Sequence, residues 1–159
     1  MSREMRIIRL KVVSMLLAAI TLLFLGCSEP APDFFDSSGK GYKYAELKNK
    51  WLVINYWATW CTPCIAEIPE LNSFASEIEE AMVIGVNYDG VQGEELQKQV
   101  SRMGIEFPVF VEDPGKKLGL PRPDVLPTTY LIAPGNEIRI VMLVGPQTRD
   151  SLKNAMVPP

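Results

Sequence analysis

Residues 52–64 read LVINYWATWCTPC, in which an apolar run broken only by Asn55 leads to two cysteines three positions apart. Residues 52–57 have the length and composition of a buried strand. If a helix begins at Cys61, its first-turn N–H groups and its macrodipole favour negative charge on that sulfur. Pro63 suits such a first turn. We therefore expect Cys61 to be the attacking thiolate and Cys64 to resolve the mixed disulfide.

Two cysteines at this spacing also form half of many zinc sites, so the remaining composition matters. The chain has no histidine and only one further cysteine, Cys27. Four thiolate or imidazole ligands are therefore not available, and we expect neither a metal nor any other cofactor. The missing histidines also exclude Cys-His and Ser-His-Asp catalysis. A purely structural disulfide stays open at this point, although so short a loop gains little from closure.

The N-terminal residues 1–26 have the pattern of an export signal. Four basic side chains precede the uncharged, mostly apolar residues 12–25, and Cys27 follows shortly after. The run LFLGC at residues 23–27 resembles the lipobox of bacterial lipoproteins, whose cysteine is acylated and becomes the first residue after cleavage. An uncleaved membrane anchor is the alternative, because residues 12–28 reach the lower end of the length that spans a bilayer.

Both readings of the N-terminus place the domain outside the cytoplasm, where disulfides persist. We expect residues 27–33 to carry the lipid and a short tether, and residues 34–159 to form one domain. Ser28 lacks the aspartate associated with retention in the inner membrane, which favours the outer membrane where a cell has one. Removing residues 1–26, with four basic and one acidic residue, changes the net charge from −3 to −6. That balance argues against nucleic-acid binding.

The remaining sequence alternates between strand and helix patterns, which predicts an α/β fold. A strand at 52–57, a helix at 62–79 and a strand at 82–87 form a parallel pair with a right-handed crossover. The proline and glycine at 134–135 predict a hairpin turn between two later strands. The other expected elements are a small hairpin within 34–44, helical segments at 45–50, 94–103, 114–120 and 148–156, and strands at 107–111, 128–132 and 138–144.

Two stretches carry a resemblance to a known family. The run NYWATWCTPC at residues 55–64, with Glu67 and Pro69 after it, resembles the thioredoxin-like TlpA and ResA group. The second stretch is LPTTYLI at residues 126–132. The resemblance covers residues 31–156. It implies a thioredoxin fold, in which helices flank a central mixed β-sheet, with an N-terminal hairpin and a strand-helix insertion between the CxxC helix and the cis-proline strand.

The resemblance also implies a groove for a substrate chain beside the cysteines. In thioredoxin folds the proline at the position of Pro127 is cis and faces the active-site disulfide. Its role there is to present the backbone of Leu126 to an incoming substrate strand. Trp60, Thr62 and Pro63, which flank the cysteines, complete the expected groove.

Two polar residues bear on the proton chemistry of the pair. Glu67 follows Cys64 by three positions, so both side chains share one helix face. If Glu67 is buried, its pKa is raised and it can take the proton of Cys64 during turnover. Family members use this glutamate in proton management. Asn55 occupies the position where ordinary thioredoxins place a buried acid, so that acceptor is missing here.

The resulting hypothesis is an extracytoplasmic, lipid-anchored thiol-disulfide oxidoreductase that reduces disulfides of exported proteins. A membrane thiol-transfer protein would restore its dithiol, and reduction of apocytochrome c before haem attachment is one pathway that the resemblance implies. The residues between the cysteines, Thr62 and Pro63, carry neither charge nor imidazole, which favours a reductant over a strong oxidant. The alternatives are a disulfide oxidase or isomerase, and a non-catalytic binding lipoprotein of thioredoxin-like fold.

Overall fold

The computed structural model describes residues 9, 11, 13–14, 30–135 and 139–157. The chain divides into Met1–Ala31 and Pro32–Pro159, and the fold described below belongs to the second unit. The predicted lipid site, Cys27, and all but four residues of the predicted signal 1–26 lie outside the described residues, as do residues 136–138 between the last two strands. Within the part that is described, no helix has the length and apolar character needed to cross a membrane.

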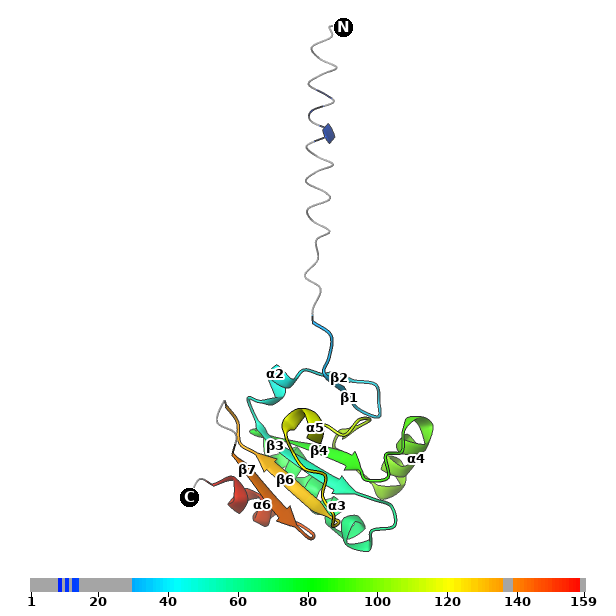
Figure 1. Ribbon diagram of the computed structural model, residues 1–159, viewed down its shortest axis with the longest axis vertical. Coiled ribbons are helices and arrows are strands. Elements are labelled where there is room, and N and C mark those ends of the chain that lie inside the picture. The colour runs from blue at the N-terminus through cyan, green and yellow to red at the C-terminus, as the bar shows by residue number, and fades with distance from the viewer. Residues whose placement is uncertain (1–8, 10, 12, 15–29, 136–138, 158–159) are drawn as a thin grey trace. The chain divides into compact units, whose positions relative to one another are not determined.

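The centre of the fold is a mixed five-stranded sheet in the order β5-β4-β3-β6-β7 (Figure 1). The central strand β3 pairs in parallel with β4 and antiparallel with β6, and β6 continues antiparallel into β7. The predicted α/β class and mixed sheet are therefore confirmed. The strands are β3 (Trp51–Trp57), β4 (Ala81–Asn87), β5 (Val109–Phe110), β6 (Thr128–Ile132) and β7 (Ile140–Val144).

Side chains of β3 alternate between two apolar cores, one on each face of the sheet. Val53 and Trp57 enter the core that also contains both cysteines and the apolar side of α3 (Thr62–Glu77). Leu52 and Ile54 enter the other core. Burial on both faces explains why β3 is apolar at nearly every position. The other elements are β1 (Phe34–Phe35), β2 (Gly41–Tyr42), α2 (Tyr44–Leu47), α4 (Gly93–Met103), α5 (Gly115–Leu118) and α6 (Arg149–Met156).

Several elements differ in length from the sequence prediction. Strand β5 has two residues instead of the five expected at 107–111. Pro108 precedes it, and a proline has no N–H to donate to the ladder. Helix α3 ends two residues earlier than predicted, where Ile78 is extended, and it continues through Pro69. Between α3 and β6 the chain forms β4, α4, β5 and α5, which include the expected strand-helix insertion.

The sheet topology brings the two stretches that carry the family resemblance to one end of the sheet. Strand β3 ends at Trp57, and α3 begins directly after Cys61. Because β6 runs antiparallel to β3, its first residue, Thr128, pairs with Tyr56 near the end of β3. Pro127, which precedes Thr128, therefore lies at the same end of the strands as the cysteine motif.

Candidate active site

Cys61 and Cys64 form a disulfide at the N-terminus of α3. Cys61 is the N-cap residue, and its sulfur accepts a hydrogen bond from the backbone N–H of Cys64 at 3.2 Å. This is the helix position that the sequence predicted. Cys61 is 4 % exposed and Cys64 is fully buried, so Cys61 is the more accessible sulfur. The geometry favours Cys61 as the attacking group, because a helix N-terminus stabilises a thiolate.

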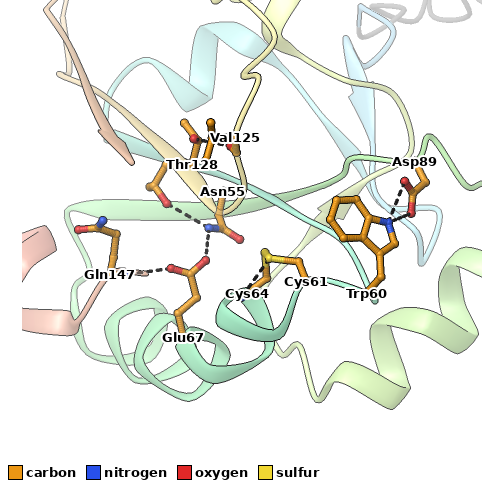
Figure 2. Close-up of a disulfide and its surroundings, with 10 residues drawn as sticks. Asn55, Trp60, Cys61, Cys64, Glu67, Asp89, Val125, Thr128 and Gln147 are labelled. Atoms are coloured by element: carbon orange, nitrogen blue, oxygen red, sulfur yellow. Dashed lines mark hydrogen bonds between the residues drawn. A yellow bond between two sulfur atoms is a disulfide. The ribbon is translucent and has the colours of Figure 1, made fainter. Parts of the chain in front are cut away.

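Glu67 lies one turn after Cys64 on α3 and is 2 % exposed. Its Oε1 accepts a hydrogen bond from Asn55 Nδ2 at 2.8 Å, and its Oε2 accepts one from the backbone N–H of Gln147 at 2.8 Å (Figure 2). Burial raises the pKa of Glu67, while the two hydrogen bonds from Gln147 and Asn55 oppose the shift, and the net direction is upward. A buried carboxyl group with a raised pKa is a candidate to exchange a proton with a neighbouring thiol once the disulfide is reduced.

Asn55 connects this carboxylate to the sheet. Its Nδ2 also donates to Thr129 Oγ1 on the neighbouring strand at 3.0 Å, so both amide hydrogens are used. Its Oδ1 is buried and has no hydrogen-bond partner among the described residues. The sequence marked Asn55 only as a missing acid and gave no indication of Thr129 or Gln147. Those contacts join positions 74 and 80 residues apart, and no local pattern reveals them.

The predicted groove residues differ in exposure. Trp60 is 64 % exposed, and its indole N–H donates to both carboxylate oxygens of Asp89, at 3.0 and 3.2 Å (Figure 2). Thr62 and Pro63 are exposed on the first turn of α3. The sequence did not anticipate the contact with Asp89.

The Leu126–Pro127 peptide bond is cis, as the family resemblance implied. Pro127 is buried, and Leu126 packs against the core cluster that contains both cysteines. Thr128 Oγ1 donates to the carbonyl oxygen of Val125 at 2.8 Å, which closes a turn around the cis bond. The two stretches of the family resemblance thus meet in space, although 62 positions separate Cys64 from Leu126.

The described residues include no group of three or more His, Cys, Asp or Glu side chains placed to hold a metal ion. The groups at this site that can react are the two sulfur atoms and the carboxyl group of Glu67. A cysteine pair at a helix N-terminus, on a mixed sheet with a cis-proline at the same end, is the site of a thiol-disulfide oxidoreductase of thioredoxin fold.

Comparisons with known proteins agree with this class. Residues 27–141 match the model of the AhpC/TSA family. The thiol-disulfide oxidoreductase ResA of Bacillus thuringiensis (strain Al Hakam) is 31% identical over 126 residues, covering 77% of this chain and 72% of that protein. The chain belongs to the AhpC/TSA family and, within it, to the ResA-like proteins of thioredoxin fold.

Solved structures show the same fold. StoA from Bacillus subtilis superposes with a TM-score of 0.61 at 22% identity, covering 76% of this chain and 92% of that chain. A thiol:disulfide interchange protein from Chlorobium tepidum TLS also has a TM-score of 0.61 at 22% identity, with coverages of 81% and 95%.

Replacing Glu67 with glutamine tests the raised pKa directly. A folded-state pKa above the unfolded value means that the folded protein binds more protons, so stability is highest below the unfolded value and falls as pH rises through the folded one. We expect the free energy of unfolding of the oxidised wild type, relative to Glu67→Gln, to fall as pH rises from 4.5 through the raised pKa. Urea unfolding across a pH series measures this, and parallel curves for the two proteins would contradict it.

Proposed function

We propose that this protein reduces disulfide bonds in exported proteins, outside the cytoplasm. The observation that carries the proposal is the difference in position and exposure between the two sulfurs. Cys61 lies at the helix N-terminus with 4 % exposure, whereas Cys64 is fully buried beside a buried carboxyl group. A substrate sulfur therefore meets Cys61 first, and Cys64 is available only for the second, intramolecular step.

In the proposed cycle the Cys61 thiolate attacks one sulfur of a substrate disulfide. The substrate S–S bond breaks, a Cys61–substrate disulfide forms, and the other substrate sulfur leaves as a thiolate that takes a proton from solvent. The sulfur of Cys64 then loses its proton to Glu67 and attacks Cys61. The Cys61–Cys64 bond forms, the second substrate sulfur leaves with the electron pair, and the substrate has gained two electrons.

The surface around the disulfide suits a protein substrate. Large apolar side chains are exposed within or directly next to the two sequence stretches of the site: Trp60 at 64 %, Ile65 at 46 % and Val125 at 55 %. Apolar contacts of this kind give affinity for an extended chain without selecting one sequence. We assign Trp60, Thr62, Pro63, Leu126 and Pro127 to the substrate groove.

The N-terminal sequence supplies the proposed location. Acylation of Cys27 would fix the protein to a membrane, and Ser28 favours the outer membrane where one exists. A tether of residues 27–33 reaches only about 25 Å, so substrates and the electron donor have to work close to that membrane. The proposed donor is a membrane protein that transfers electrons between thiol pairs. Apocytochrome c, with a cysteine pair to be kept reduced, belongs to the proposed substrate class.

Insulin reduction tests the catalytic proposal. The dithiol form of the full chain should accelerate reduction of insulin disulfides, and Cys61→Ser should lower the rate to the uncatalysed background because no attacking thiolate remains. The matched control is Cys27→Ser, which also removes one sulfur but leaves the pair, and should keep the wild-type rate. Equal rates for wild type and Cys61→Ser would instead identify a non-catalytic binding protein.

Metabolic labelling with a radioactive fatty acid tests the location. In a bacterial host the wild-type chain should incorporate label and sediment with membranes, whereas Cys27→Ala should do neither, because the acylated sulfur is gone. Cys64→Ser serves as the matched control and should label as the wild type does. Unlabelled wild-type protein that still sediments with membranes would point to the uncleaved anchor.

A further inference from the structure

The amide oxygen of Asn55 is an unpaired acceptor in the interior of the active site. Asn55 is fully buried, and the hydrogens of its amide nitrogen go to Glu67 and Thr129. Its Oδ1 has no partner among the described residues. Because a buried carbonyl without a hydrogen bond costs free energy, this oxygen requires an explanation.

The orientation of the amide is fixed by its neighbours. Turning it over would bring Oδ1 against the carboxylate of Glu67 and the hydroxyl of Thr129, and would lose the hydrogen bond to the carboxylate. Oδ1 therefore points away from both. Figure 2 shows it on the side of the amide that faces the Cys61–Cys64 disulfide.

The position of Asn55 in the sheet agrees with that view. Alternate residues of a strand share one face, so Asn55 points to the same side of β3 as Val53 and Trp57. Both of these belong to the core cluster that contains Cys61 and Cys64. Asn55 is therefore in the layer between the sheet and α3, where Cys64 is buried.

We propose that Asn55 Oδ1 accepts a hydrogen bond from the Cys64 thiol when the disulfide is reduced. In the disulfide Cys64 has no hydrogen, so Oδ1 is unpaired. Reduction breaks the S–S bond, and two electrons and two protons from a dithiol donor convert the pair to thiols. One of those protons then lies on Cys64, at the unpaired acceptor. The inference rests on the proposed function in so far as the pair must cycle between these two states.

This contact makes Asn55 a positioning residue for the resolving step. An amide oxygen is too weak a base to keep the proton, so the proton passes to Glu67 when the Cys64 sulfur attacks Cys61. The same amide holds both groups, the thiol through Oδ1 and the carboxylate through Nδ2. A hydrogen bond to the neutral thiol also favours that form, which keeps Cys64 protonated while Cys61 is a thiolate.

The residues paired with Asn55 in the sheet carry no charge that would compete for this role. The strand neighbours of Asn55 are Gly85 on β4 and Thr129 on β6, which do not titrate. On the side of α6, Arg149 binds Glu77 at the outer surface of α3. Among the groups bonded to Cys64 or hydrogen-bonded to the Asn55 amide, those that titrate in the dithiol state are Cys61 and Glu67.

Infrared spectroscopy of the reduced full chain tests the proposal through the S–H stretching band. The band that Cys64→Ser removes should lie at lower frequency than the band of a free thiol, because hydrogen bonding weakens the S–H bond. Asn55→Leu should move it up to the free-thiol position, whereas Asn55→Asp, which keeps an acceptor oxygen, should not. The matched control is Thr129→Val, which removes the other amide contact and should leave the band in place.

A band that is unchanged in Asn55→Leu overturns the proposal. If Asn55→Leu does not fold, the wild type still decides: the ¹³C resonance of the Asn55 side-chain carbonyl should move on reduction, and a constant resonance overturns it. Insulin reduction tests the proposed function separately. Normal reduction of insulin with an unshifted S–H band would reject only the hydrogen bond, whereas a shifted band without insulin reduction would reject only the reductase.

Discussion

The buried carboxyl group of Glu67 is the contact on which the rest of the site depends. It belongs to α3, and its two oxygens accept hydrogen bonds from Asn55 on β3 and from the backbone N–H of Gln147 before α6. One side chain thereby fixes the helix that carries both cysteines against the central strand and the C-terminal segment. Hydrogen bonds to an ionised carboxylate are strong, whereas burial opposes the charge. The balance raises the pKa of Glu67 and leaves a group able to take or give a proton almost out of contact with solvent.

The two cysteines receive different support from this framework. The sulfur of Cys61 interacts with the backbone, since Cys61 is the N-cap residue of α3 and its sulfur accepts a hydrogen bond from the N–H of Cys64. Cys64 is buried, as are the side chains of Asn55 and Glu67 on the same side of the sheet. In the proposed cycle, thiolate stabilisation and proton transfer therefore fall to separate parts of the fold. An ordinary thioredoxin would place an acid at the position of Asn55; here the acid comes from the helix, and the strand supplies an amide that holds it.

Much of this arrangement follows from local sequence pattern, and the rest does not. The apolar run of β3 and the cysteines at a helix start could be predicted, because each depends on residues adjacent in sequence, whereas the cis Leu126–Pro127 bond was implied only by the family resemblance. The length of β5 could not, since Pro108 limits the pairing only once β4 is its neighbour. The hydrogen bond between Glu67 and Gln147 joins positions 80 residues apart, and a backbone N–H leaves no signature in the sequence. Whether the side-chain oxygen of Asn55 has a hydrogen-bond partner depends on which groups surround it in the fold, and the sequence alone does not show those groups.

In the proposed cycle the redox state of the Cys61–Cys64 pair and the proton on Glu67 are coupled. The most direct test is the reduction potential of the pair, measured by equilibration with glutathione over a range of pH for the wild type and for Glu67→Gln. If the pKa of Glu67 differs between the disulfide and dithiol states, the potential of the wild type changes slope between those two pKa values. We predict such a change in the wild type, beginning above pH 4.5, and its loss in Glu67→Gln. Curves of the same slope throughout would show that Glu67 is not coupled to the pair.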